Sequence, residues 1–250
     1  MTELNERIKK KDNNIFMIGE ATSADAETTK WYTENNMVDK VITLQYLTFK
    51  DEEKLEELPE DKQHVPLDLK EFKKTQEAFQ EMSSDKGGPI LFWSNHDLPR
   101  SPQKFGDMEN YRDSTAKMMA TLLYLQPGIP IIYYGEEIGM NTVWFEDPEN
   151  ITDAGVMDFY NAARQQGWSL EKTMYHLNLT SRDNSRGIMQ WTDEDRVGFT
   201  ESAAPWTIFN QEARYNVKDQ EADEKSILNY YRQLMKLRKT DLFKKAHGRC

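Results

Sequence analysis

Two carboxylates of this sequence stand shortly after apolar runs. Glu20 follows residues 15–18 through a glycine, and Asp97 follows residues 90–93 through Ser, Asn and His. In parallel-sheet proteins the chemistry lies at the carboxyl ends of strands, so both side chains are candidates for one site. Two carboxyl groups facing each other across a cleft can share the protonation and charge stabilisation that cleavage of a glycosidic bond requires. Each carboxylate taken alone is more often a structural residue that a nearby Lys or Arg neutralises.

Two further residues favour the functional interpretation of this pair. His96 directly precedes Asp97, and Arg182 lies in the sequence Ser-Arg-Asp-Asn. Both side chains can donate hydrogen bonds to a polar ligand. A sugar site also needs aromatic rings against which the sugar can pack. The aromatic residues that we consider for the wall of such a cleft are Trp144, Phe145, Trp191, Phe199 and Trp206.

Other kinds of chemistry find no support in the sequence. The four histidines stand at positions 64, 96, 176 and 247, and no cluster with Cys, Asp or Glu has metal-ligand spacing. We therefore predict no metal and no cofactor. Neither of the glycine-rich phosphate motifs occurs, which disfavours a nucleotide site, and no G-x-S-x-G marks a serine nucleophile.

The elements that must position these residues alternate between strand and helix patterns. The predicted strands are residues 15–18, 41–47, 90–93 and 131–134. The predicted helices are residues 3–11, 23–35 with Ser23 as N-cap, 67–82, 111–126 and 226–239. This alternation predicts an α/β fold with a parallel sheet, either a (β/α) barrel or a doubly wound sheet. Residues 141–220 show little periodicity and are too long for a simple loop, so we expect them to carry binding elements.

Composition and charge exclude some classes of binding partner. The 250 residues carry a net charge of −11, which argues against nucleic acid and anionic membranes as partners. No run of 18 apolar residues occurs, and the first residues lack the apolar core of a signal peptide. The single cysteine, Cys250, excludes an internal disulfide, so we expect a cytoplasmic protein.

Four segments in order along the chain resemble the α-amylase family of glycoside hydrolases. They are residues 16–20, 92–100, 132–140 and 181–191. Within that family the sequence is most similar to the group of oligo-1,6-glucosidases, α-glucosidases and trehalose-6-phosphate hydrolases. The resemblance implies a (β/α)8 TIM barrel and retaining hydrolysis of α-glucosidic bonds in short oligosaccharides. It implies that Glu20 is the general acid/base, that Asp97 stabilises the transition state, and that His96 and Arg182 hold the nonreducing-end glucose.

The sequence departs from the family pattern in ways that affect these expectations. The family's nucleophile is an Asp in a motif like Gly-Phe-Arg-x-Asp, which does not occur in the 250 residues. Met1 falls where the family has the helix before the fifth strand. We therefore expect residues 1–250 to be the C-terminal half of the catalytic barrel, strands five to eight with their helices and the excursion at about 141–220. Such a fragment would be inactive alone, and the missing N-terminal half-barrel would be a partner.

Two smaller departures concern the substrate. The family's Arg-Thr-Pro-Met-Gln-Trp reads Arg-Gly-Ile-Met-Gln-Trp at residues 186–191, and residues 153–157 lack a Glu that many α-1,6-specific relatives carry. The sequence therefore does not fix the linkage.

Two alternative functions stay open at this point. A transglycosylase or isomerase of the same family would share all four segments. A catalytically inactive remnant could serve as a binding or assembly module. The absent nucleophile motif favours the remnant, whereas the presence of both Glu20 and Asp97 argues against a long-standing loss of catalysis.

Overall fold

The computed structural model describes residues 1–47, 67–83, 88–202, 205, 207, 209–210, 215–241 and 243. Trp206 and Cys250 lie outside the described residues. The N-terminal elements are α1 (Thr2–Lys11), β1 (Ile18–Glu20), α2 (Ala26–Glu34), β2 (Lys40–Ile42), α3 (Leu69–Ser83) and β3 (Ile90–Leu91). The elements that follow are α4 (Ser101–Phe105), α5 (Arg112–Tyr124), β4 (Ile129–Pro130), α6 (Ala154–Gln165), α7 (Leu170–Thr180), α8 (Val217–Ala222) and α9 (Ile227–Arg238).

The strands form two parallel pairs. β1 pairs with β2, and β3 pairs with β4, each in parallel register. The Tyr46 hydroxyl, just beyond β2, donates to the carbonyl of Phe92 at 2.8 Å and accepts from its N–H at 3.0 Å. This residue therefore ties the segment after β2 to the segment after β3. Parallel strands joined through helices form an α/β fold, as the alternation in the sequence predicted.

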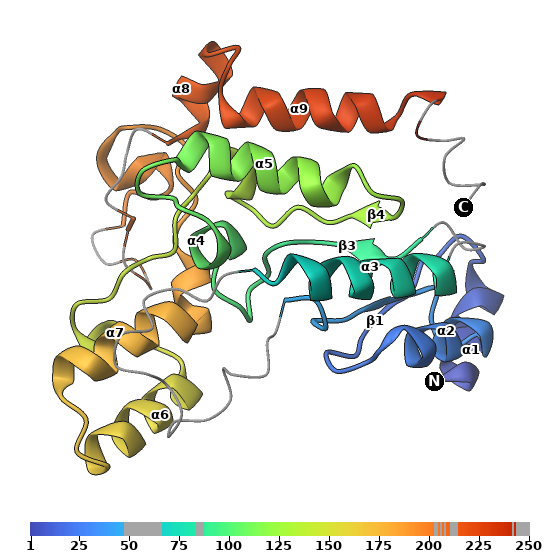
Figure 1. Cartoon of the computed structure of the whole chain (residues 1–250), viewed down its shortest axis with the longest axis horizontal. Helices are drawn as coiled ribbons and strands as arrows, with labels where there is room; N and C mark the ends of the chain where they lie inside the picture. The colour runs from blue at the N-terminus through green and yellow to red at the C-terminus, as the bar shows by residue number, and fades with distance from the viewer. Residues whose placement is uncertain are drawn as a thin grey trace.

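The helices cover the strands on the outside. α2 packs against α3, and α5 packs against α9, as Figure 1 shows. Trp93 is fully buried beneath them; its indole N–H donates to the carbonyl of Met119 at 2.7 Å, and its ring stacks on Phe72 at 5.3 Å. Trp93 is thus a core residue, and its contacts fix the position of the chain that follows β3.

All four predicted strands have different bounds in the structure. The second was expected at residues 41–47 and is Lys40–Ile42, and the third was expected at residues 90–93 and is Ile90–Leu91. The first was expected at residues 15–18, but Ile15 and Phe16 are exposed and the strand begins at Ile18. Two backbone groups there bond to side chains: Lys9 donates to the Ile15 carbonyl, and Met17 N–H donates to Asp39 at 2.7 Å. The fourth strand was expected at residues 131–134 and is Ile129–Pro130.

The predicted cap of the second helix is also wrong. Asp25, not Ser23, caps α2, because its carboxylate accepts the N–H of Thr28 at 2.8 Å. The helix therefore begins at Ala26, and its cap lies two residues later than predicted. A carboxylate at this position satisfies one of the free N–H groups of the first turn.

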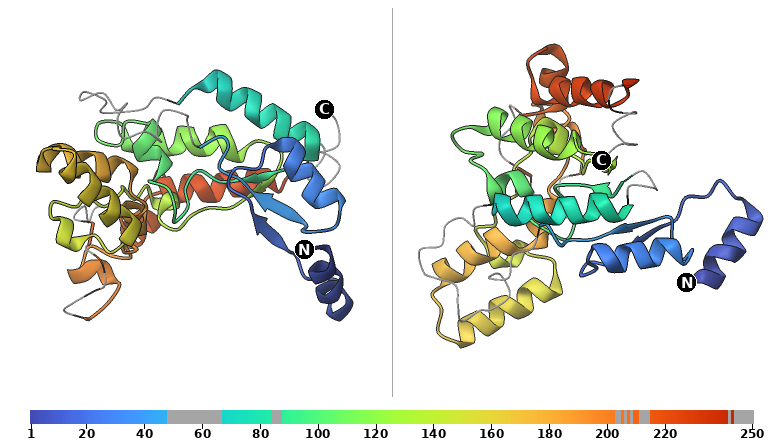
Figure 2. Two further views of the ribbon diagram at one scale, coloured as in Figure 1. Left: turned by 90° about the horizontal axis from the view of Figure 1, so that it is seen from below. Right: turned by 45° about the vertical axis from the view of Figure 1, so that its right-hand side comes forward.

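The excursion at residues 141–220 contains more regular structure than expected. α6 and α7 form a helical pair that lies at the opposite end of the molecule from α1 (Figure 2). Gly167 makes the turn between them with a φ of +87°, which favours glycine. Their own small core includes Phe145, Met174 and Leu177. None of the helices in the described part of the chain is both long and apolar enough to cross a membrane.

Candidate active site

Asp97 is held at the carboxyl end of β3 by its own loop. The Asn95 side chain accepts the N–H of Asp97 at 3.0 Å and the N–H of Leu98 at 2.9 Å. Asn side chains favour such turns because they replace a backbone acceptor. A few residues on, the N–H of Ser101 donates to the Ser94 hydroxyl at 3.2 Å and closes the loop. The Asp97 carboxylate, 29% exposed, thus has a defined place on the surface.

The structure brings three of the four predicted site residues together. His96 Nε2 lies 3.4 Å from Asp97 Oδ2. Arg182 Nη1 lies 3.5 Å from Asp97 Oδ1, and Arg186 Nη2 lies 3.4 Å from the same oxygen. Asp97 therefore has three basic neighbours within 3.5 Å. Segments about 85 residues apart in sequence meet here.

Glu20 is the fourth predicted residue. It is the last residue of β1, as the sequence indicated, and it is exposed. Within the described residues its side chain has no hydrogen bond or ion pair to Asp97 or to Arg182. The general acid/base role of Glu20 stays a prediction.

Sequence reasoning missed three charged residues of this cluster. Asp153 Oδ2 lies 2.5 Å from Arg182 Nε, and Arg186 Nη1 lies 3.7 Å from the same oxygen. Asp183 Oδ1 lies 3.4 Å from Arg186 Nη1. The hydrogen bond from Arg182 holds the pKa of the Asp153 carboxyl below its usual value, and the same bond raises the pKa of Arg182.

A sequence signal existed for two of these three residues. Asp183 and Arg186 flank Arg182 within the Ser-Arg-Asp-Asn-Ser-Arg segment, which folds as the 3₁₀ turn η5 (Arg182–Arg186). Asp153 shows only the pattern of a helix N-cap, and its ion pair with Arg182 joins positions 29 residues apart. No local pattern predicts that pair.

A cleft of about 290 Å³ opens beside Asp97. Its lining includes the charged residues Asp97, Asp153 and Arg182 and the apolar residues Phe159 and Leu177 from α6 and α7. A lining that combines charged and apolar side chains suits a sugar, which has hydroxyl groups around an apolar ring face. The volume is near the lower end for small-molecule sites.

Of the five aromatic residues proposed for the cleft wall, Trp206 lies outside the described residues and the other four do not line this cleft. Trp144, Trp191 and Phe199 are each about half exposed on the surface, and Phe145 is buried in the α6–α7 core. The aromatic ring of the cleft is Phe159, which the sequence did not single out.

Arg100 connects the loop of Asp97 to the arginine segment. It is buried, and its guanidinium donates to the carbonyls of Tyr134 at 2.9 Å and Ser185 at 3.1 Å. The guanidinium also lies over the rings of Tyr133 and Tyr134, at 5.1 and 5.2 Å from their centres. Such contacts stabilise a buried cation. Arg100 thus fixes η5 against the chain after β3.

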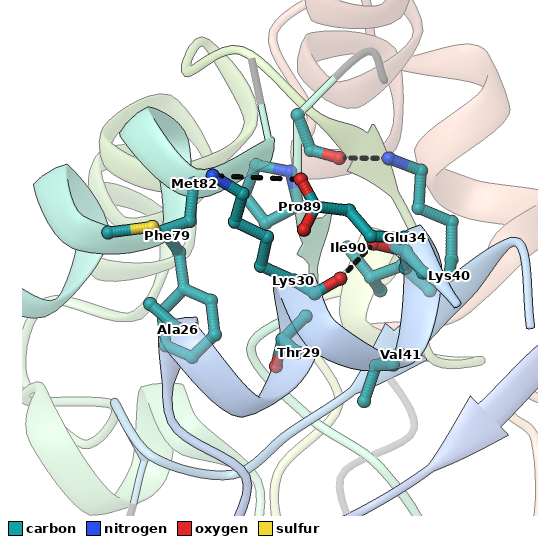
Figure 3. Close-up of a pocket in the computed structure, with 12 residues that line it drawn as sticks. Ala26, Thr29, Lys30, Glu34, Lys40, Val41, Phe79, Met82, Pro89 and Ile90 are labelled. Carbon is teal, nitrogen blue, oxygen red and sulfur yellow. Dashed lines mark hydrogen bonds and ion pairs between the residues drawn. The ribbon is translucent and has the colours of Figure 1, made fainter. Parts of the chain in front are cut away.

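A second pocket lies at the other ends of the strands. Figure 3 shows it among Thr29, Lys40, Phe79 and Ile90, with Lys40 donating to the Gly88 carbonyl at 2.5 Å. Its volume is about 20 Å³, which is room for about one water molecule. We therefore do not consider it a substrate site. In the described residues no group of three or more His, Cys, Asp or Glu could hold a metal ion.

Comparison with known proteins agrees with this architecture. Residues 1–246 match the family described as "Alpha amylase, catalytic domain". The chain is 36% identical to an oligo-1,6-glucosidase of Halalkalibacterium halodurans, over 90% of this chain and 40% of the relative. It is 32% identical to a glucan 1,6-alpha-glucosidase of Streptococcus pneumoniae, over 91% of this chain and 43% of the relative.

The solved structures that resemble this chain include a hydrolase and a synthase. The trehalose-6-phosphate hydrolase of Bacillus licheniformis superposes with a TM-score of 0.83 at 31% identity, over 97% of this chain and 43% of that one. The trehalulose synthase MutB superposes with a TM-score of 0.81 at 27% identity, over 95% of this chain and 42% of that one. Both comparisons cover nearly all of this chain.

The α/β fold and these similarities agree on one family. The chain belongs to the α-amylase catalytic-domain family. It spans about 40% of the length of the curated relatives it matches.

Proposed function

We propose that this chain supplies the acid/base and the transition-state stabiliser of a retaining α-glucosidase acting on short oligosaccharides. The proposal rests above all on the joining of Asp97, His96 and Arg182 beside one cleft in a chain of the α-amylase family. The relatives are named as glucosidases of 1,6-linked substrates, which supports an α-glucosidic bond as the target. We expect the activity in the cytoplasm.

In this proposal each residue has a separate task. Glu20 protonates the leaving oxygen and later activates water. Asp97 stabilises the positive charge that develops on the sugar in the transition state, and its ion pairs fix the carboxylate before the reaction starts. His96 and Arg182 donate hydrogen bonds to hydroxyls of the nonreducing-end glucose.

The family motif that carries the nucleophile does not occur in residues 1–250. A retaining mechanism needs a second carboxylate about 5–5.5 Å from the acid. We propose that residues 1–250 are strands five to eight of the barrel and that the nucleophile comes from strand four, outside these residues. The cleft beside Asp97 would then be completed by the other half of the barrel.

Hydrolysis of 4-nitrophenyl α-glucoside tests this proposal. We expect no turnover by residues 1–250 alone, and turnover after addition of the N-terminal half of the barrel from the Halalkalibacterium halodurans relative. The Glu20→Gln variant should abolish that turnover. Turnover by residues 1–250 alone that Glu20→Gln removes would overturn the half-barrel assignment. No turnover in the mixture would contradict the glucosidase proposal and favour a binding or assembly module.

Transfer of the glucosyl group to a sugar is the second candidate function. The similarity to trehalulose synthase favours it, because an isomerising enzyme shares this half of the barrel. Product analysis with sucrose distinguishes the two functions. Glucose and fructose as the main products indicate hydrolysis, and an isomeric disaccharide indicates transfer.

A further inference from the structure

We propose that Asp153 is a positioning residue that holds the Arg182 guanidinium in place for a sugar hydroxyl. Asp153 acts through Arg182 and does not itself bind the sugar. The inference rests on the proposed function, in which Arg182 contacts the substrate.

The guanidinium of Arg182 contacts two carboxylates, Asp153 and Asp97, and the contact of Arg182 with Asp153 is the shorter one. Its Nε lies 2.5 Å from Asp153 Oδ2, whereas its Nη1 lies 3.5 Å from Asp97 Oδ1. The Asp153 side chain is 7% exposed and the Asp97 side chain 29%. A charge-assisted hydrogen bond is stronger at the shorter distance and where less water competes. Asp153 therefore determines where the guanidinium points.

Asp153 is itself rigidly held. Its Oδ1 accepts the N–H groups of Gly155 at 2.9 Å and Val156 at 3.2 Å, which caps α6. Its backbone N–H donates to Asp183 Oδ2 at 2.8 Å, and Asp183 also accepts the N–H of Thr152 at 2.9 Å. One carboxylate oxygen is thus used for the helix cap, and the other is directed at Arg182.

Arg186 closes the same network from the other side. Its Nε donates to the carbonyl of His96 at 2.8 Å, and its two terminal nitrogens approach Asp97, Asp153 and Asp183. Arg186 therefore stays paired with Asp97 when Nη1 of Arg182 contacts a ligand. Three carboxylates and two guanidiniums share the charge of the cluster.

The remaining exposed part of Arg182 faces the cleft. The side chain is 45% exposed and belongs to the cleft lining. A guanidinium whose Nε is fixed presents its outer N–H groups in one plane. The class of ligand that fits is a neutral sugar hydroxyl, because Asp97 and Asp153 together would repel an anion.

The test is a substitution that removes the charge of Asp153 and keeps the cap. Asn caps helices about as well as Asp, so Asp153→Asn should leave α6 folded. Asp25→Asn is the matched control, since Asp25 caps α2 in the same way and contacts no arginine of the cluster. The readout is the Arg182 Nε–H signal in ¹H–¹⁵N spectra of residues 1–250, assigned with Arg182→Lys.

We expect the Arg182 Nε–H signal to move in Asp153→Asn and to keep its position in Asp25→Asn. We then mix each protein with the N-terminal half of the barrel, add d-glucose and follow the same signal. The apparent Kd for glucose should rise about tenfold in Asp153→Asn, because about one charge-assisted hydrogen bond is lost. In Asp25→Asn it should not change.

The outcomes separate this inference from the proposed function. An unmoved Nε–H signal in Asp153→Asn overturns the positioning role. A moved signal with an unchanged glucose Kd overturns the link between Asp153 and sugar binding. If glucose does not affect Arg182 even in the wild type, the proposed substrate contact is wrong, and the Nε–H shift alone still decides whether Asp153 holds Arg182.

Discussion

Two carboxylates, one beyond β3 and one beyond β4, lie in contrasting surroundings. Asp97 is partly exposed and faces two arginines and a histidine beside a cleft. Glu136 is buried, and one of its oxygens accepts the hydroxyls of Tyr124 at 2.6 Å and Tyr231 at 3.0 Å. The first is arranged for a ligand, and the second joins α5 to α9.

The difference shows that a perturbed carboxyl does not by itself mark the reacting group. Burial raises the pKa of Glu136 to about 7, while the hydrogen bonds from the tyrosines and the charge of Arg100 oppose that rise. A pKa near neutrality is what a general acid needs, yet Glu136 does not line the cleft beside Asp97. Position beside the cleft is the better guide here.

The largest effect should follow from neutralising Asp97. In the mixture that hydrolyses 4-nitrophenyl α-glucoside, Asp97→Asn should lower kcat by about 10²–10³-fold, because one fixed group that stabilises transition-state charge is lost. Asp193→Asn, at an exposed position outside the cluster, serves as the control. A loss of less than about tenfold in Asp97→Asn would show that Asp97 is structural.

The second effect is a pH dependence of stability that comes from Glu136. Its pKa rises from 4.5 to about 7 on folding, so the folded state binds this proton more tightly. The stabilisation is fully present below about pH 4.5 and is lost as the pH rises through 7, a change of about 3 kcal/mol. Charged and titratable groups around Glu136 are Tyr124, Tyr231, Arg100 and Glu137.

Urea unfolding between pH 5 and 8 measures this change. The wild type should lose free energy of unfolding over that range, and Glu136→Gln should lose about 2.5 kcal/mol less. Equal pH slopes in the two proteins would mean that Glu136 stays ionised in the fold. Asp153 adds no slope in this window, because its pKa is lowered from 3.8.

The same contrast explains what sequence could predict. Glu20, His96, Asp97 and Arg182 could be proposed because strand ends and motif segments are local patterns, and three of them lie together in the structure. The partners of Arg182 depend on how the α6–α7 pair folds back, which no local pattern records. Asp153 was therefore missed.

The fold was predicted to a similar extent. Helices at 69–83, 112–124 and 227–238 lie close to their predicted ranges, because their apolar faces repeat at helical spacing. The strands are short, and side chains such as Lys9 and Asp39 take the backbone bonds beside β1. These bonds join residues far apart in the sequence, so the apolar runs alone could not predict where the strand begins.

The smallest effect should come from removing one tyrosine hydroxyl from Glu136. Tyr231→Phe should cost about 1 kcal/mol of unfolding free energy and raise the pKa of Glu136 further, since the hydrogen bond from Tyr231 lowers it. Tyr230→Phe is the control on the same helix, because its hydroxyl pairs with Thr121 at 2.6 Å instead. Both variants should lose stability, but only Tyr231→Phe should move the pH midpoint upward. A shift of equal size in both would mean that helix packing, and not the hydrogen bond to Glu136, controls the titration.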